Sequence, residues 1–237
     1  GKFPLAQCIK EILEICRNEL LCEVELEFAA DVIPESNGQE IVLKLLQVRP
    51  VGDYSDDANC SIENIENSFT QTVIKSTKAL GSGLFSDMKY VVMVPASSFD
   101  SSKTNEMAAE IARINKKIKD EGASYLLLGP GRWGSSDPWL GIPVVWSDIS
   151  EAKLIIETAI PGYRIEPSQG THFFQNITSL GVGYLTIDTV IGDGMIDENA
   201  ISSFECVESK EFVKVYKTPE GFTGYIDRSS NEAVIGF

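Results

Sequence analysis

Two short, continuous apolar runs flank one amphipathic helical stretch, and this pattern limits the fold more than any other feature of the sequence. Residues 90–94 and 125–128 are apolar without alternation, which is typical of strands buried on both faces of a sheet. Residues 103–121 between them have a helical apolar period, and Gly122 follows as a helix stop. The apolar positions are Met107, Ile111, Ile114 and Ile118. Strand, helix and strand in this order predict a right-handed parallel crossover within a mixed α/β fold.

The N-terminal part predicts a helix followed by a β-hairpin. Apolar residues recur at a helical period over residues 3–21, with Pro4 near the start. Residues 24–28 then alternate between apolar and acidic or small side chains, as a strand does. Residues 34–38 contain Pro, Ser, Asn and Gly and predict a turn, after which residues 41–48 return as the second strand.

The segments outside these two patterns predict a linker and a β-rich C-terminal part. Residues 52–67 are polar and acidic, which indicates a linker or an exposed excursion. Residues 69–80 fit a short helix or a short strand equally well. The C-terminal region is mainly strand-like, with turns expected at residues 192–194 and 219–221.

Composition excludes several classes of partner and location. The formal net charge of −15 repels nucleic acid and anionic membranes, so we expect neither as a partner. The 5 cysteines form no Cys-x-x-Cys pair, which is typical of free thiols in a reducing compartment. No apolar run reaches the roughly 20 residues that span a bilayer. The start has no Met and resembles neither a signal nor a transit peptide, so we expect a cytoplasmic protein that continues upstream of Lys2.

Four polar residues on the two hairpin strands are candidates for a metal and phosphate site. Glu25 and Glu27 are two positions apart, so a strand places both on one face about 7 Å apart. Their repulsion is roughly 2 kcal/mol at an effective dielectric near 20, and a cation would relieve it. Gln47 and Arg49 have the same spacing on the strand expected to pair with the first. Two carboxylates and an amide oxygen suit Mg²⁺, and a guanidinium suits phosphate; the alternative is a surface hairpin in which Arg49 simply pairs with a glutamate.

The sequence of these two strands resembles the end of the ATP-grasp-type nucleotide domain of phosphoenolpyruvate synthase and pyruvate phosphate dikinase. The resemblance covers the sequence ELEF at residues 25–28 and the sequence LLQVRP at residues 45–50. It implies that Glu25, Glu27 and Gln47 hold Mg²⁺ and that Gln47 and Arg49 contact ATP. In that family the glycine-rich loop that holds most of the nucleotide lies upstream, so ATP and Mg²⁺ would need a half that this sequence does not contain.

A second stretch, residues 129–146, contains glycines, Arg132 and three tryptophans, of which Trp133 and Trp139 lie in its glycine-rich part. Its closing Leu-Gly-Ile-Pro, residues 140–143, is similar to the turn that follows the phosphate-carrying histidine in the swivelling domain of those enzymes. Asp137 stands near the place of that histidine. A glycine-rich turn can present amides to an anion, with Arg132 adding charge. The alternative is a structural turn whose tryptophans pack against the sheet.

The single histidine, His172, is the remaining candidate for a catalytic group. It follows Gly170 and Thr171, as the phosphate-carrying histidine follows glycine and hydroxyl residues, but it comes after the Ile-Pro turn instead of before it. A lone histidine beside two phenylalanines is also typical of a core or edge position. His172 is thus a candidate phosphoryl acceptor whose structural alternative stays open.

We expect three segments and one phosphotransfer function. Residues 1–52 would end an ATP-grasp-type nucleotide-binding domain, residues 53–85 would be a linker, and residues 86–237 would form a swivelling-like α/β domain with a β-rich C-terminal part. The resemblance implies a fragment of an ATP-dependent phosphotransferase that is inactive alone and is a kinase when full length. Its partners would be ATP, the upstream domain, and pyruvate or another small phosphoryl acceptor. The alternative is a non-catalytic module that binds an anion or a partner.

Overall fold

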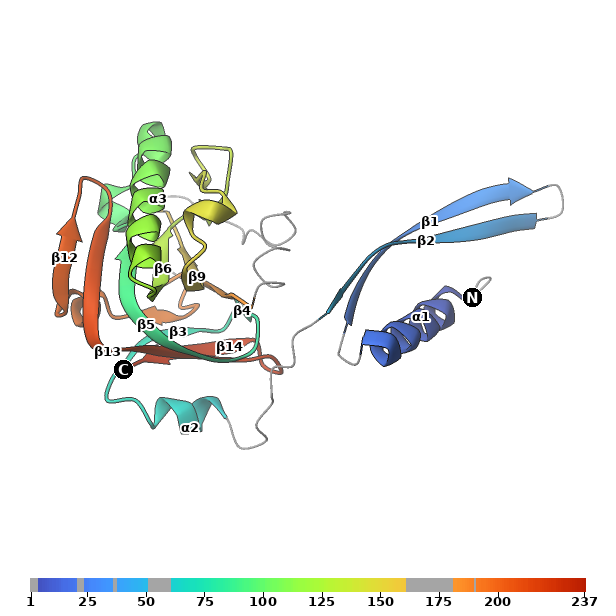
Figure 1. Ribbon diagram of the computed structural model, residues 1–237, viewed down its shortest axis with the longest axis horizontal. Coiled ribbons are helices and arrows are strands. Elements are labelled where there is room, and N and C mark those ends of the chain that lie inside the picture. Colours follow the sequence, from blue (N-terminus) through green and yellow to red (C-terminus); the bar gives the residue numbers. More distant parts are fainter. Residues whose placement is uncertain (1–3, 21–23, 36–37, 51–60, 161–180, 190) are drawn as a thin grey trace. The chain divides into compact units, whose positions relative to one another are not determined.

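The computed structural model describes residues 4–20, 24–35, 38–50, 61–160, 181–189 and 191–237. The chain forms two compact units, Gly1–Tyr54 and Ser55–Phe237 (Figure 1). Helices and strands are mixed along the chain, as the sequence predicts. Among the described residues, no helix combines the length and the apolar character needed to cross a bilayer.

The N-terminal unit consists of helix α1 (Leu5–Leu20) and the antiparallel strands β1 (Val24–Glu35) and β2 (Gly38–Pro50). The predicted helix and hairpin are therefore confirmed, with strands longer than the alternating text alone indicates. A β-bulge interrupts the register between Glu27 and Phe28. An extra residue in one strand changes which of its side chains share a face beyond that point.

One face of the hairpin is apolar on both sides of the bulge, and the other face is polar. Before it Glu27 is opposite Gln47, and after it Phe28 is opposite Leu45, so Leu46 is the additional residue. On one face the paired positions are apolar: Val24 with Pro50, Leu26 with Val48, Phe28 with Leu45, Ala30 with Leu43, and Val32 with Ile41. The other face carries the acidic, basic and amide positions. The hairpin is amphipathic because the bulge shifts the alternation of β2 by one residue.

The second unit is built on one large mixed sheet. Four strands at its centre run parallel in the order β5 (Gly83–Met93), β6 (Ser124–Pro130), β9 (Ala152–Thr158) and β10 (Gly183–Ile187). On the β5 side the sheet continues through antiparallel strands, and short strand β4 lies at the other edge. These strands are β13 (Lys214–Asp227), β14 (Glu232–Gly236), β3 (Thr72–Ser76), β11 (Met195–Ile196), β12 (Glu205–Ser209, beside β13) and β4 (Ala79–Leu80).

Helix α3 (Thr104–Asp120) connects β5 to its parallel neighbour β6 and covers one face of the sheet (Figure 1). The predicted apolar stripe of α3 is fully buried: Met107, Ile111, Ile114 and Ile118. The helix ends before Gly122, which has a φ of +64° and so adopts the left-handed conformation that favours glycine. The predicted parallel crossover is confirmed.

Two hydrophobic cores lie on opposite faces of this sheet. Along β5, Tyr90 and Val92 pack into the core beneath α3, and Val91 and Met93 pack into the other. The second core also includes residues of α5 (Glu198–Ser202), and α2 (Ile62–Glu66) packs against β14. Burial of alternate residues on both faces explains why the run in β5 is continuously apolar.

Two sequence-based expectations differ from the structure. The segment 53–85, expected to be a linker, contains α2, β3, β4 and the beginning of β5. Strand β3 has three buried residues, Val73, Ile74 and Ser76, although the sequence around it is polar. The turn expected at residues 219–221 is an irregularity inside β13, where the register with β5 shifts between Lys217 and Phe222. A long strand with a bulge and a hairpin turn share the same Pro and Gly signals.

Candidate functional site

The hairpin register brings together the four positions predicted for metal and phosphate. Glu25 lies opposite Arg49, and Glu27 lies opposite Gln47. Directly opposed residues of an antiparallel pair share a face, as do residues two apart on one strand. Positions 25, 27, 47 and 49 therefore form one contiguous patch on the polar face.

The polar face continues toward the hairpin tip as an exposed ion pair. Lys44 Nζ lies 2.6 Å from Asp31 Oδ2, and both side chains are more than half exposed, at 58% and 53%. Such a pair contributes only about 0–1 kcal/mol. The side chains of Glu27 and Gln47 are exposed, whereas only the backbone is described for Glu25 and Arg49. Among the described side chains, no group of three or more His, Cys, Asp or Glu could hold a metal ion.

The glycine-rich loop after β6 uses its own amides inside the protein. The amides of Gly131 and Arg132 donate to the carbonyls of Thr158 (2.9 Å) and Leu140 (2.8 Å). The amide of Trp133 donates to Glu157 Oε1 at 2.9 Å, and that of Gly134 donates to a carbonyl in β8 (Gly141–Ile142) at 2.8 Å. Four consecutive amides are thus engaged by the fold, as in a structural turn. Arg132 itself is half-buried, and its role toward an anion stays a prediction.

The two tryptophans of this loop differ in their surroundings. Trp133 is 2% exposed, and its Nε1 donates to the carbonyl of Ile156 at 3.0 Å. Trp139 is 64% exposed, and its amide donates to Asp137 Oδ1 at 3.0 Å. Asp137, which stands near the place of the family's histidine, therefore shapes the turn that presents Trp139. Of these two tryptophans, only Trp133 packs against the sheet.

Glu157, at the end of β9, is a buried acid that the sequence analysis did not single out. Glu157 is only 4% exposed. The hydroxyl of Tyr184 on the neighbouring strand donates a hydrogen bond to its Oε2 at 2.6 Å. With the bond from Trp133, the carboxylate fixes the loop to the carboxyl end of the sheet. A single glutamate closing an apolar run carries no sequence signal that separates it from a surface residue. Its partners become visible only in the fold, where β10 brings Tyr184 beside it and the loop after β6 brings Trp133.

A groove of about 510 Å³ lies at the same end of the parallel strands. Its walls come from the segment after β5, from the loop after β6, from the residue pair after β9, and from the turn between β12 and β13. The lining residues are Ser97, Ser98, Phe99, Asp100, Ser101, Trp139, Ile160 and Phe212. In open α/β sheets, the carboxyl ends of the parallel strands are the usual place for ligands.

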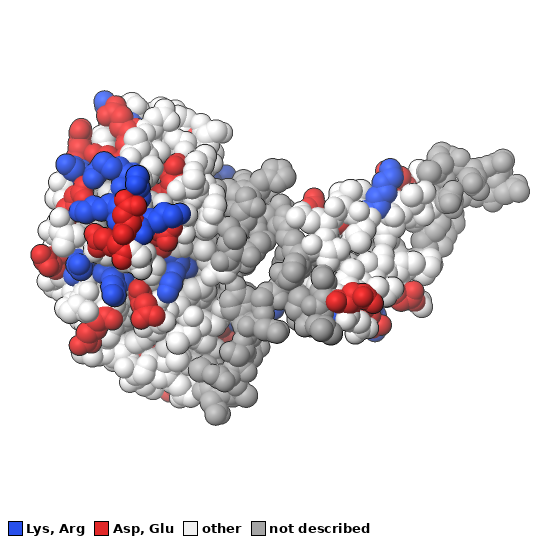
Figure 2. Space-filling view, in the orientation of Figure 1, with Lys and Arg blue, Asp and Glu red and all other residues white. Residues whose placement is uncertain are grey.

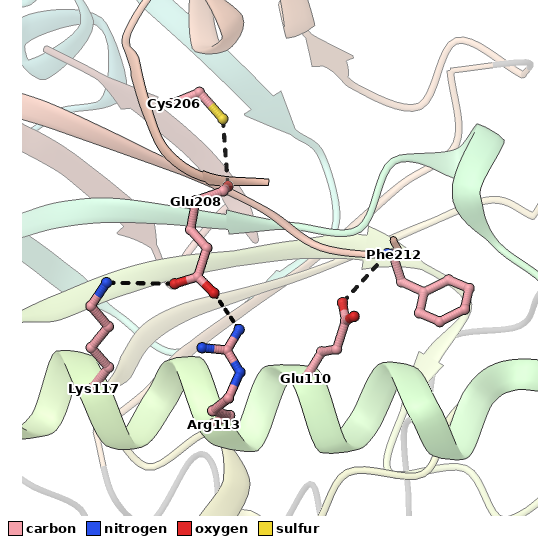
Figure 3. Close-up of polar contacts among 6 residues, drawn as sticks. All are labelled: Glu110, Arg113, Lys117, Cys206, Glu208 and Phe212. Atoms are coloured by element: carbon pink, nitrogen blue, oxygen red, sulfur yellow. Dashed lines mark hydrogen bonds and ion pairs between the residues drawn. The ribbon is translucent and has the colours of Figure 1, made fainter. Parts of the chain in front are cut away.

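Helix α3 holds the β12–β13 turn through charged contacts (Figure 3). Glu208 on β12 accepts a hydrogen bond from Arg113 and forms an ion pair with Lys117 at 3.5 Å. Glu110 accepts a hydrogen bond from the amide of Phe212 at 3.4 Å. Burial raises the pKa of Glu208, but the hydrogen bond and charge of Arg113 and the charge of Lys117 outweigh it and hold that pKa below its ordinary value. These contacts fix one wall of the groove.

Basic side chains on the α3 face are matched by acidic ones. Figure 2 shows Lys and Arg interleaved with Asp and Glu over this face. Besides the Glu208 contacts, the ion pairs are Lys103 with Glu106, Lys116 with Asp120, and Lys119 with Glu151. The described part of α3 therefore presents an alternating charge pattern rather than a positive field.

His172, the predicted phosphoryl acceptor, lies within residues 161–180, outside the described residues. Its role stays a prediction.

Comparison of the sequence and fold with protein-family models, curated proteins and solved structures found no match. The resemblance of residues 25–28 and 45–50 to the phosphoenolpyruvate synthase family therefore enters the functional argument as a motif similarity only.

Proposed function

We propose that this chain is a fragment of an ATP-dependent phosphotransferase related to phosphoenolpyruvate synthase and pyruvate phosphate dikinase. Its β1–β2 hairpin would close the magnesium–nucleotide site of that enzyme. The observation that carries the proposal is the register, in which Glu25 opposes Arg49 and Glu27 opposes Gln47. An offset by one residue would have placed the acids and their partners on opposite faces.

The residue types at these positions fit a magnesium-bound polyphosphate. Carboxylates at positions 25 and 27 and an amide oxygen at position 47 are hard oxygen donors of the kind that Mg²⁺ prefers. The ion would supply charge neutralisation between the nucleotide's phosphate oxygens. Arg49, on the same face, would contact the transferring phosphoryl group through its planar guanidinium.

The apolar face of the hairpin supports completion of this unit by another part of the protein. Phe28, Val32 and Leu45 are 39%, 55% and 46% exposed. A two-stranded ribbon is only marginally stable in water unless such a face is covered. We infer that the upstream nucleotide-binding domain covers it and provides the remaining contacts to ATP.

The proposed acceptor is His172 or a small molecule such as pyruvate. The full-length protein, incubated with Mg²⁺ and ATP that is labelled in both its β- and γ-phosphoryl groups, should acquire an acid-labile phosphohistidine, because phosphoramidate bonds hydrolyse in acid. The His172→Ala variant should lose this label. Complete transfer to protein or product by that variant would remove the histidine from the mechanism.

One observation favours a second candidate, a non-catalytic partner-binding module. The amides of residues 131–134 are all engaged within the protein, so the loop that leads to the Leu-Gly-Ile-Pro turn is a structural element. In this alternative the second unit would have lost the shuttle role. Full-length protein that binds no Mg-ATP and acquires no label would favour the module.

A further inference from the structure

The groove at the carboxyl end of the parallel strands has the position and size of a small-ligand site. It lies where the segments after β5, β6 and β9 converge, and its volume of about 510 Å³ is within the usual range for small-molecule pockets. The nucleotide proposal concerns the other unit and assigns no role to this groove. Its lining residues therefore need a separate account.

The groove walls are held by local hydrogen bonds. Asp100 Oδ1 accepts from the amide of Ser102 at 2.8 Å and from its hydroxyl at 2.7 Å. Asp137 fixes the turn of Trp139, and Glu110 holds the amide of Phe212. Preorganised walls reduce the entropy that a ligand must lose on binding.

An exposed aromatic ring and a carboxylate dominate the chemistry of the groove. Trp139 is 64% exposed, although a large aromatic side chain gains most when it is covered. The hydrogen bonds from the side chain and backbone of Ser102 lower the pKa of Asp100, which keeps the carboxylate charged at neutral pH. Because Ser102 uses Oδ1, Oδ2 accepts no hydrogen bond from the described residues, and the nearby charge of Lys103 is paired with Glu106.

Among the residues that the structure describes, no lysine or arginine lines the groove. Asp100 is the one charged residue of this described lining, and the whole chain has a formal net charge of −15. An anion would therefore be repelled. A cation would gain from the carboxylate and from the negative face of the indole ring, which attracts ammonium groups.

We propose that this groove binds an organic ammonium group, with its charge against Asp100 Oδ2 and its alkyl part against Trp139. The serine hydroxyls provide further acceptors for the ammonium hydrogens. A neutral polyol fits less well, because the carboxylate of Asp100 gains more from a cation than from a neutral hydroxyl group. The group belongs either to a free amine or to a lysine side chain of another protein.

The test titrates the full chain, without nucleotide or Mg²⁺, while indole N–H resonances are followed by nuclear magnetic resonance. The probes are n-butylammonium as a free amine and acetyl-Gly-Lys-Gly-amide as a lysine source, with n-butanol and butyrate as neutral and anionic matches. Both cations should shift the Trp139 resonance with millimolar affinity, and the other two probes should not. Trp139→Ala identifies the resonance by its loss. A peptide that binds more tightly than n-butylammonium indicates a protein lysine as the source; equal affinity indicates a free amine.

Variants separate this site from general attraction of cations to an acidic protein. Asp100→Asn should weaken n-butylammonium binding about fivefold. Trp139→Ala, whose binding is measured by calorimetry because the variant lacks the reporter resonance, should weaken it about threefold. Glu220→Gln removes an exposed charge from β13 outside the groove and should leave the affinity unchanged. Equal shifts with n-butanol, an affinity that Asp100→Asn does not change, or no shift with either cation would overturn the proposal. None of these outcomes depends on the hairpin or on ATP.

Discussion

At the residue scale, Glu208 is the acid whose surroundings predict the clearest pH dependence. Its folded pKa lies below its unfolded pKa, so its contribution to stability is present above about pH 4.5 and is lost as the pH falls through the folded pKa. Arg113 and Lys117 are about half exposed, at 49% and 56%, so solvent screening limits the gain. We expect Glu208→Gln to lower the free energy of unfolding at pH 7 by about 1 kcal/mol.

Asp120→Asn is the matched control, because Asp120 pairs with Lys116 on the same helix with both side chains more exposed, at 66% and 75%. Urea unfolding at pH 7 should show little change for this variant. The difference between wild type and Glu208→Gln should shrink as the pH is lowered below about 4.5. A difference that stays constant down to the lowest pH at which the protein folds would contradict the assigned ion pairs.

At the scale of elements, the loop from β6 to β8 depends on a close backbone approach at Gly141. A Cβ atom there would lie 1.9 Å from the carbonyl oxygen of Arg132, where backbone cannot yield. We expect Gly141→Ala to cost about 3 kcal/mol and to expose Trp133, which tryptophan fluorescence during urea unfolding would detect. Gly122→Ala is the control: nothing lies within 4 Å of its Cβ, and its φ of +64° predicts a cost of only about 1 kcal/mol. Equal unfolding midpoints for wild type and Gly141→Ala would contradict this packing.

The elements differ in how far their sequence determines them. Helix α3 and strands β5 and β6 could be predicted because a periodic or continuous pattern of apolar residues directly indicates which side chains are buried. Strand β3 could not, because it owes its place to pairing with β14 and β11, which are distant in sequence. Glu157 and Trp139 could not be assigned either, since their opposite exposures depend on how the loop after β6 folds back.

At the scale of the whole molecule, the two units have different kinds of stability. Both hydrophobic cores belong to the unit Ser55–Phe237. In the hairpin unit Val24 is buried, whereas Phe28, Val32 and Leu45 are exposed. The sequence alone predicted the spacing of the four polar hairpin residues, but the bulge at Leu46, which sets the amphipathic faces of the hairpin, became visible only in the register. The proposed nucleotide site therefore depends on which part of the protein covers the apolar face of the hairpin.

The affinity of the full-length protein for Mg-ATP, measured by calorimetry, tests this account most directly. Glu27→Gln should weaken binding about tenfold at limiting Mg²⁺, because it removes one anionic oxygen donor and keeps the shape of the side chain. Glu14→Gln, an exposed acid of α1, should bind Mg-ATP as the wild type does. Equal affinity of wild type and Glu27→Gln, or no binding by the wild type, would contradict the central claim that the polar face of the hairpin is the edge of a nucleotide site.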